Sequence, residues 1–344
     1  MSGGNQNVSF AVKYKENLYE VPVDGISLSE ITRALNVNTL NSAYLIIQME
    51  TIERSQLGMP TVSNGVSIST LVDPIEIRIV VINGSGSANG GANINHSGKY
   101  YLRMNGSRVT SAQSTLVNYN TSINAMEHML SSTSGSNGNL LYTAKVEGNS
   151  IIGPIMGSIF YSDINSHWAK ADINELTSKL VVGPRSTGAI TFDANRNITR
   201  GEFGEYIAKA LGLKSDITSN SFPDVSANTR GGYINSAVKA GIITGYPDGT
   251  FKPEQFITRE QMALMMVRAM SYAKENITLN GTAAQTLSRF RDASGIQDKE
   301  TVAKAVQSGI IQGMSATSFQ PKGNATRAQA VVMIRRVLSK INYL

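Results

Sequence analysis

The chain has 344 residues, no cysteine and a formal net charge of +6. This length predicts two or three domains, and the lack of cysteine excludes disulfides, cysteine nucleophiles and cysteine-based zinc sites. No run of residues is long and apolar enough to span a membrane, so we expect no membrane insertion. The start, Met-Ser-Gly-Gly, is unlike a signal peptide. If the protein acts outside the cell, we expect this chain to be a mature or trimmed fragment.

The charge is unevenly distributed along the chain. Residues 1–158 hold 9 Lys and Arg against 10 Asp and Glu, a net charge of −1. Residues 159–344 hold 22 against 15, a net charge of +7. A basic C-terminal part suits an anionic partner, such as an acidic wall polymer, a membrane surface or nucleic acid. Its Lys and Arg residues are scattered and no nucleic-acid-binding motif is present, so we expect no nucleic-acid partner.

Residues 1–158 are predicted to form a β-rich, sandwich-like domain. Apolar and polar residues alternate as in half-buried strands, for example with Ile75, Ile77 and Ile79 on one face. Strands are predicted at 8–14, 74–82, 99–104 and 140–146. A short helix is predicted over 123–130. Flexible, glycine- and serine-rich loops are predicted at 84–91 and 131–138.

Nothing in residues 1–158 singles out a catalytic centre. A glycosidase needs two carboxylates roughly 5–10 Å apart, and none of the ten acidic residues here lies in a context that selects it. The glycine-rich stretch 84–91 lacks the Lys-Ser/Thr of a phosphate-binding P-loop. His96 and His128 are interpreted as surface polar residues rather than ligands. We therefore predict no catalytic residue, no metal site and no cofactor.

The C-terminal part contains one motif three times. It opens with an aromatic residue, any residue and Asp, at Tyr161-Ser162-Asp163, Phe222-Pro223-Asp224 and Phe290-Arg291-Asp292. It closes with a Thr-Arg pair, at Thr199-Arg200, Thr258-Arg259 and Thr326-Arg327. The separations from Asp to Arg are 37, 35 and 35 residues. A fixed internal period of this kind indicates tandem structural repeats.

Each repeat is predicted to fold as helix, loop, helix. In the second repeat, Ile234, Ala237 and Val238 share a helical face and Gly241 ends the helix. The second helix of every repeat is predicted to begin at its Thr-Arg pair, where a Glu or Gln three residues after Thr completes a capping box. The capping pairs are Thr199 with Glu202, Thr258 with Gln261 and Thr326 with Gln329.

The arginine after each capping threonine stands where the helix dipole makes a cation unfavourable by about 0.3–1 kcal/mol. Its recurrence indicates a compensating anion. Free backbone N–H groups at the helix start are expected to be available to a carboxylate or phosphate, and Arg adds a bidentate fork. The alternative is that each Arg pairs with the Asp of its own repeat and only holds the repeat together. In a mixed role, the Asp orients an Arg that also meets ligand.

At this point the residues resemble a known family. From about Tyr161 to Leu344 the chain resembles three tandem S-layer homology domains. The resemblance rests on the three Thr-Arg elements and on 161–169, 245–249 and 309–313. It implies a pseudo-three-fold helical body, and hence a multidomain α+β chain. The implied domains are 1–158 for the β-rich part and 159–216, 217–285 and 286–344 for the repeats.

The resemblance implies a binding module without enzymatic activity, which anchors a surface protein non-covalently to the wall of a Gram-positive-type bacterium. In this family the Arg of the motif lines a groove between repeats and contacts an acidic, pyruvylated secondary cell wall polysaccharide. Carried over to this sequence, the expected ligand-contacting residues are Arg200, Arg259, Arg327, Asp163, Asp224, Asp292, Trp168, Tyr246 and Asp248. Trp168 would stack on a sugar face, or else serve as a packing anchor.

The three grooves are not expected to be equal. The usual Thr-Arg-Ala-Glu motif appears here as Thr-Arg-Gly-Glu, Thr-Arg-Glu-Gln and Thr-Arg-Ala-Gln. The Gly-Tyr-x-Asp-Gly loop is present in the second repeat at 245–249, but not in the first or the third. Two alternatives stay open for the whole chain. One is a self-associating S-layer lattice protein, and the other is a wall-acting glycoside hydrolase with its active site in residues 1–158.

Overall fold

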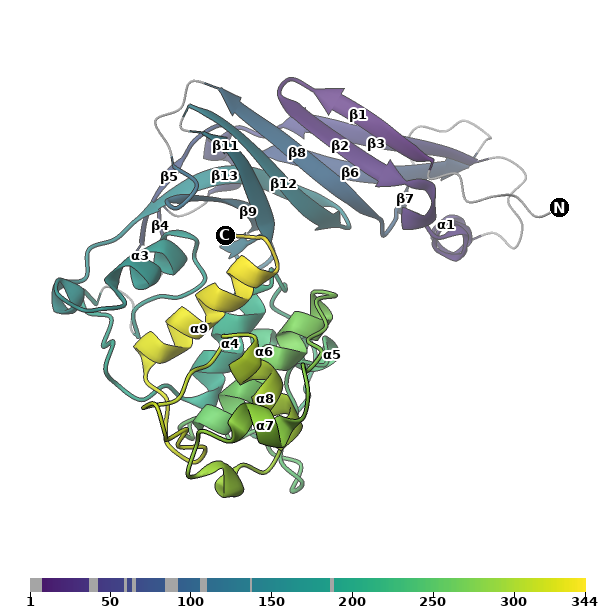
Figure 1. Cartoon of the computed structure of the whole chain (residues 1–344). Helices are drawn as coiled ribbons and strands as arrows, with labels where there is room; N and C mark the ends of the chain where they lie inside the picture. The colour runs from purple at the N-terminus through teal and green to yellow at the C-terminus, as the bar shows by residue number, and fades with distance from the viewer. Residues whose placement is uncertain are drawn as a thin grey trace. The chain divides into compact units, whose positions relative to one another are not determined.

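A computed structural model of the chain describes residues 8–36, 43–58, 61–63, 66–83, 92–105, 110–136, 138–185 and 189–344. The chain divides between Gly157 and Ser158 into two compact units (Figure 1). The first unit is built mainly of strands and the second of helices, which confirms the predicted α+β class. The helices among the described residues are too short or too polar to cross a membrane.

Two sheets form the first unit. One has the strand order β1 (Ser9–Tyr14), β2 (Asn17–Pro22), β8 (Ser97–Asn105), β12 (Asn139–Glu147) and β11 (Ser131–Ser136). The other has the order β10 (Ala125–His128), β9 (Ser114–Asn120), β13 (Ser150–Ser158), β5 (Val66–Thr70) and β4 (Val62–Ser63). In the second sheet, β6 (Ile75–Asn83) pairs with β13, with β3 (Ala43–Thr51) and with β7 (Ala92–Asn93). The short helices of this unit are α1 (Leu28–Leu35) and α2 (Arg54–Leu57).

The two sheets share one hydrophobic core. Ile75, Ile77 and Ile79 of β6 are buried on the same face, as the alternation predicts, and Tyr19 and Tyr100 reach the core from the other sheet. Burying a large apolar side chain stabilises the fold by roughly 1.5–3 kcal/mol. The strands predicted at 8–14, 74–82, 99–104 and 140–146 are confirmed as β1, β6, β8 and β12.

The prediction of a helix over 123–130 is wrong. Residues Ala125–His128 form strand β10, which pairs antiparallel with β9 in the register Met126↔Tyr119. Asn124 adopts a left-handed φ of 48°, so the chain reverses sharply just before β10. The hairpin contacts with β9 thus outweigh the local helical pattern.

Two further predictions in this unit need correction, and one is untested. Most of the stretch predicted as a loop at 131–138 is strand β11, which pairs with β12 through backbone groups that any sequence supplies. His96 and His128 are buried rather than exposed, because hydrogen bonds to neighbouring side chains satisfy their rings. His96 Nδ1 lies 2.6 Å from the Tyr19 hydroxyl, and His128 Nδ1 lies 3.1 Å from the Thr115 hydroxyl. The loop predicted at 84–91 lies outside the described residues.

The second unit consists of three helix pairs, as the repeats predict. They are α3 (Lys170–Ser178) with α4 (Arg200–Ala210), α5 (Thr229–Lys239) with α6 (Arg259–Tyr272), and α8 (Lys299–Gln307) with α9 (Arg327–Lys340). A short helix, α7 (Ala283–Leu287), precedes the third pair. The first helix of each pair packs against the second helix of the preceding pair, α5 on α4, α8 on α6 and α3 on α9. Because α3 returns to α9, the three pairs close into a ring.

The local helix signals hold throughout the second unit. Thr199, Thr258 and Thr326 each cap a second helix in a complete capping box, as predicted. Gly241 has a φ of +72° just after α5, the left-handed conformation that ends a helix. A further capping box, Thr282 with Gln285, starts α7 and was not predicted.

A ring of three backbone hydrogen bonds links the repeats ahead of their second helices. Ile198 N–H donates to Ala325 C=O at 3.0 Å, Ala325 N–H to Ile257 C=O at 3.2 Å, and Ile257 N–H to Ile198 C=O at 3.1 Å. All three side chains are fully buried. Each repeat therefore contacts both others at this point, and the second helices start at equivalent places around the ring.

Candidate functional site

The arginine at the start of each second helix reaches into the loop of the next repeat. Arg200 Nε donates to Phe251 C=O, Arg259 Nε to Phe319 C=O and Arg327 Nε to Phe192 C=O, each at 2.9 Å. Each guanidinium also reaches a second carbonyl of the same loop through Nη2: Thr244 at 3.5 Å, Gln312, and Gly183 at 2.7 Å, respectively. We call these contacts the first, second and third joints, after Arg200, Arg259 and Arg327.

The aspartate of each repeat holds the same loop from its other side. Asp224 accepts hydrogen bonds from the N–H groups of Phe251 and Lys252, at 2.9 and 2.7 Å. Asp163 does the same for Phe192 and Asp193, and Asp292 for Phe319 and Gln320. Burial opposes ionisation of Asp224, but these two backbone hydrogen bonds outweigh it and lower its pKa. Asp292 follows the same pattern, and its pKa is also lowered.

The internal Arg–Asp pair considered from the sequence is not observed. In the described residues, the hydrogen bonds and ion pairs of Arg200, Arg259 and Arg327 include none to Asp163, Asp224 or Asp292. Instead, the Asp accepts a hydrogen bond from the backbone N–H of the loop phenylalanine. The Arg of the neighbouring repeat donates to the backbone C=O of that same phenylalanine. The arginines therefore connect repeats instead of closing each repeat on itself.

The helix starts are not open to an anion, contrary to the sequence prediction. At α6, the N–H groups of Arg259 and Glu260 donate to Gly323 C=O and Pro321 C=O, at 2.9 and 3.1 Å. The N–H of Gln261 donates to the capping Thr258 hydroxyl. The starts of α4 and α9 are occupied in the same way by the loops of the next repeats. Any anion at a joint must therefore be held by side chains.

The three arginines are all buried, with exposed fractions of 3% for Arg200, 4% for Arg259 and 0% for Arg327. Arg327 alone among them forms an ion pair within the described residues, from Nη1 to Glu202 Oε1 at 2.8 Å. Within the part of the chain that the structure describes, Arg200 and Arg259 donate to carbonyl oxygens alone and stack on aromatic rings. Burial lowers the pKa of both, because a cation is poorly solvated there, and the nearby charges of Asp224 and Asp292 oppose this lowering only in part.

The S-layer homology domain family matches residues 160–203, 221–263 and 289–331. Each matched segment begins beside the aromatic-x-Asp motif and ends inside the second helix of a repeat. The C-terminal part of the chain carries three S-layer homology domains.

Relatives of the chain include proteins named as enzymes and a protein named for anchoring. "Exoglucanase XynX" of Acetivibrio thermocellus is 37% identical over 216 residues, which are 60% of this chain and 18% of that protein. "Amylopullulanase" of Thermoanaerobacterium thermosulfurigenes is 31% identical over 327 residues, 92% of this chain and 16% of that protein. "Cellulosome-anchoring protein" of Acetivibrio thermocellus is 29% identical over 154 residues, 43% of this chain and 34% of that protein. The chain thus spans less than a fifth of the first two relatives.

The loop of the second S-layer homology domain brings the predicted Tyr246 and Asp248 to the first joint. The guanidinium of Arg200 lies 4.6 Å from the centroid of the Tyr246 ring, within cation–π range. Lys252 Nζ lies 4.4 Å from the same centroid and 2.9 Å from Asp248 Oδ2. Asp248 also accepts a hydrogen bond from Thr250 N–H and so shapes the turn. This joint therefore combines an aromatic ring, two cations and an exposed carboxylate.

Trp168 lies in the first S-layer homology domain, two residues before α3. Its side chain is 66% exposed, so the alternative role as a packing anchor is wrong. The ring lies 5.4 Å from that of His167, whose Nε2 is 3.2 Å from Asn195 Oδ1. The loop containing Asn195 also accepts the first N–H groups of α9. The exposed indole of Trp168 thus neighbours a residue that contacts the loop of the third joint.

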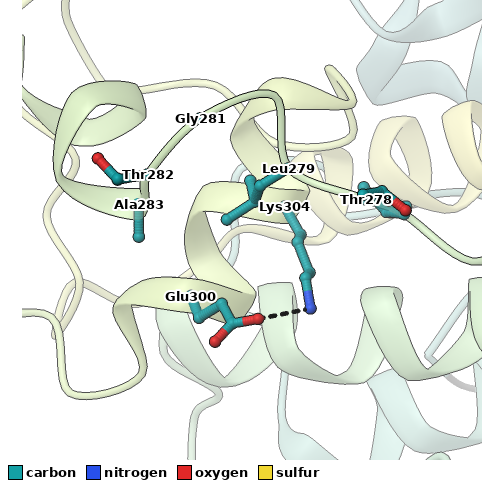
Figure 2. A pocket seen from close by; sticks show the side chains of 8 residues that line it. Thr278, Leu279, Gly281, Thr282, Ala283, Glu300 and Lys304 are labelled. Carbon is teal, nitrogen blue, oxygen red and sulfur yellow. Dashed lines mark ion pairs between the residues drawn. The ribbon is translucent and has the colours of Figure 1, made fainter.

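A shallow hollow of about 470 Å³ lies between residues 277–283, which precede the third S-layer homology domain, and Glu300 and Lys304 of helix α8 (Figure 2). Its polar lining includes the ion pair between Lys304 and Glu300, at 2.9 Å. Among the described residues, no group of three or more His, Asp and Glu side chains could hold a metal ion.

One part of the joints was missed from the sequence, although a signal for it exists. A phenylalanine stands seven residues before each capping threonine, at Phe192, Phe251 and Phe319. Its backbone is the element that Arg and Asp hold together. The next residue in each loop, Asp193, Lys252 or Gln320, has a left-handed φ of 57–58°. Only the folded chain shows that this constant spacing places the phenylalanine backbone between an Arg and an Asp that both bind it.

Proposed function

We propose that the helical unit anchors a cell-surface protein non-covalently to the bacterial wall by binding an anionic, pyruvylated secondary cell wall polysaccharide at the joints. The observation that carries the proposal is that Arg200 and Arg259 are buried and form no direct ion pair among the described residues, while Asp224 and Asp292 act on them only through charge at a distance. A buried charge is costly unless it is paired. A carboxylate of the polymer would supply a directly bonded partner through charge-assisted hydrogen bonds.

The other predicted residues have supporting roles in this proposal. Asp163, Asp224 and Asp292 hold the loops against which the arginines lie. Tyr246 and Asp248 offer a ring face and a carboxylate to sugar hydroxyl groups, and exposed Trp168 offers a second ring face. The names of several relatives agree with this role, among them "Cellulosome-anchoring protein" and "Cell surface glycoprotein 1" of Acetivibrio thermocellus. We place the protein at the outer wall of a Gram-positive-type cell.

Sedimentation of the full chain with purified wall sacculi tests the proposal. We expect the chain to pellet with the sacculi, and binding to weaken as salt rises, because partly exposed charges are screened over about 8–10 Å near 0.1 M. Chemical removal of the pyruvate groups should abolish pelleting. Equal pelleting with pyruvylated and depyruvylated sacculi would contradict a charge-based mechanism.

The same experiment separates the two alternatives. A relative named "S-layer protein" from Bacillus thuringiensis subsp. finitimus is 31% identical over 49% of this chain, which favours a test of lattice formation. Ordered assemblies seen by electron microscopy without sacculi would support self-association. Release of soluble sugars from the sacculi would support a hydrolase activity in residues 1–158. Pelleting without either result supports plain anchoring.

A further inference from the structure

The first unit carries an exposed, positively charged sheet face that the proposed function does not use. It is the side of the sheet β1-β2-β8-β12-β11 that points away from the hydrophobic core (Figure 1). We call it the basic face, after its outward residues Lys13, Lys99, Arg103 and Lys145. We propose that the basic face binds an acidic polysaccharide chain, whose carboxylates are held around Tyr101. The inference is independent of the joints and adds a second contact with a wall polymer.

Strict alternation along strand β8 places the central group of this face. Tyr100 and Leu102 are buried in the core. Lys99 and Arg103 are exposed on the opposite side, with the half-buried Tyr101 between them. Each cation stands about 7 Å from Tyr101 along the strand, because two residues of an antiparallel strand rise by that distance. Since β8 is the middle strand of the five, this group lies at the centre of the face.

Two lysines stand directly opposite each other on the basic face. In the antiparallel pair of β8 and β12, Lys99 is the register partner of Lys145, and both side chains are exposed. Like charges at directly opposite positions destabilise a sheet. A carboxylate bound between the two ammonium groups would remove this repulsion, so a ligand anion would stabilise the sheet at this point.

The acidic side chains of the basic face are engaged with other groups. Glu20 is the register partner of Lys99, but its carboxylate accepts hydrogen bonds from the hydroxyls of Ser9 at 2.7 Å and Tyr101 at 3.3 Å. In the part of the chain that the structure describes, Lys99 and Arg103 form no ion pair, and Arg103 Nη1 lies 3.5 Å from an amide oxygen. Both cations are therefore accessible to an external carboxylate.

The charge of the basic face differs in sign from that of the unit that carries it. Its four basic residues stand against two acidic ones, Glu20 and Glu147, a net charge of +2. Residues 1–158 as a whole have a net charge of −1. Positive charge is thus concentrated on one face, which makes this face complementary to a polyanion.

The remaining residues of the face favour a polysaccharide over other polyanions. Thr143 and Ser132 stand in one row with Tyr101 and offer hydroxyl groups to a sugar, beside the ring of the tyrosine. No large apolar side chain is exposed on this face among the described residues, as insertion into a lipid surface would need. Single-stranded nucleic acid stacks on several aromatic rings, whereas Tyr101 is the one aromatic residue at the outward positions of these strands.

Acetylation of lysines in the full chain tests the site directly. A bound polyanion shields the amines that it covers from N-hydroxysuccinimide acetate, and mass spectrometry measures the rate at each lysine. The probe is polygalacturonate, a polysaccharide with carboxylates but no pyruvate, and neutral dextran is the control. We expect polygalacturonate to slow the acetylation of Lys99 and Lys145. Lys15 should be unaffected, because it lies in a turn and its Nζ donates to Thr51 of the other sheet.

Removal of charge measures what the basic face contributes to affinity. The double variant Lys99→Gln with Arg103→Gln should bind polygalacturonate about three- to tenfold more weakly by calorimetry, as expected for two exposed ion pairs. Its Tm should not fall, because the repulsion between Lys99 and Lys145 is also removed. The matched control, Arg33→Gln with Arg54→Gln, removes two exposed cations from helices α1 and α2, outside the face, and should keep the affinity.

The results separate this inference from the proposed function. Equal protection of Lys15 and Lys99, no protection of either, or an equal loss of affinity in the two double variants would overturn the inference. Stronger protection of Lys99 by oligo-dT than by polygalacturonate would overturn the choice of a polysaccharide. If the chain does not pellet with sacculi but Lys99 and Lys145 are protected, the proposed function fails and the inference stands. Pelleting without protection rejects the inference alone.

Discussion

At the scale of single residues, the arginines of the repeats have a structural role that is independent of any ligand. Arg259 is only 4% exposed and donates to two carbonyl groups of the next repeat, those of Phe319 and Gln312. Removing it leaves the buried Phe319 C=O and the partly buried Gln312 C=O without this donor. An unsatisfied buried group costs about 1–3 kcal/mol. A loss of binding in an Arg259 variant is therefore informative only beside a measurement of stability.

Arg259→Ala is expected to lower the free energy of unfolding by about 1–3 kcal/mol, because the buried Phe319 C=O and the partly buried Gln312 C=O lose their donor. Arg259→Lys should recover only part of this, since an ammonium cannot form the planar fork. Denaturant unfolding of the full chain measures the loss, and sacculus binding on the same preparation measures affinity. If the folded fraction binds with native affinity, Arg259 is not a ligand contact.

Arg268→Ala is the control for that experiment. Arg268 lies on the same helix, α6, and its hydrogen bond to the Thr244 hydroxyl, at 3.1 Å, is exposed. Surface substitutions usually change stability by no more than about 0.5 kcal/mol. A loss as large as that of Arg259→Ala would show that helix α6 is sensitive to any change of charge.

Acid is expected to destabilise the helical unit through its loop aspartates. The pKa values of Asp224 and Asp292 lie below their ordinary value of 3.8 in the folded chain, because backbone hydrogen bonds to the carboxylates outweigh their burial. Their contribution is thus fully present above about pH 4 and is lost as pH falls through the folded pKa. Denaturant unfolding midpoints measured from pH 7 to pH 3 should show this, and Asp224→Asn should reduce the slope. A slope that Asp224→Asn leaves unchanged would contradict the role of this residue.

At the scale of elements, each loop between the two helices of a repeat contains one residue in an unfavourable backbone conformation. Asp193, Lys252 and Gln320 are left-handed at equivalent positions, which costs an L-residue roughly 1–2 kcal/mol. The aspartate of the repeat accepts the N–H of the same residue and offsets that cost. The loop is thereby fixed where the arginine of the preceding repeat needs its carbonyl.

The capping threonines are expected to contribute more at a joint than elsewhere. Thr258→Ala removes a cap from α6, whose start also binds Pro321 and Gly323 of the next repeat, so we expect a loss of about 1–2 kcal/mol. Thr282→Ala removes the same cap from α7, a helix of five residues away from the joints, and should cost about 0.5 kcal/mol. Thermal unfolding of the two variants compares them. Equal losses would show that the cap acts only within its own helix.

At the scale of the whole helical unit, the three repeats form a closed ring with no free end. The contacts of α3 with α9 are reinforced by Arg335, whose Nε lies 2.7 Å from Glu175 Oε2 and 3.2 Å from Asp172 Oδ1. The third joint and the bond from Ile198 N–H to Ala325 C=O also connect the first repeat to the last. Each repeat therefore depends on both others for buried contacts.

A chain that ends after residue 285 is expected to lose the fold of the first two repeats as well. Phe192 C=O would lack the donor Arg327, Arg259 would lack both of its acceptors, and α3 and α6 would expose the faces that α9 covers. Circular dichroism and protease resistance of this truncation, beside a fragment of residues 158–344, measure the effect. The longer fragment should fold and bind sacculi. A folded two-repeat fragment would contradict the dependence on ring closure.

The sequence by itself determined the local elements of this protein. Capping boxes, the helix stop at Gly241 and the alternation in β6 depend on residues close in the chain, so their signals are complete within one element. The motif repeated at a fixed period likewise predicted three equivalent units. The local sequence pattern gave wrong predictions for β10 and β11, because pairing with neighbouring strands outweighed the short-range pattern there.

The tertiary structure alone decided what the repeated residues contact. Arg327 binds Phe192, 135 residues earlier in the chain, and Glu202, 125 residues earlier. No local pattern encodes such a pairing, because ring closure brings together the first and last repeats. The same closure places Glu202 beside Arg327. The other two capping positions hold the neutral Gln261 and Gln329. The motif therefore identifies three similar joints, whereas long-range packing determines which charged side chains meet at each joint.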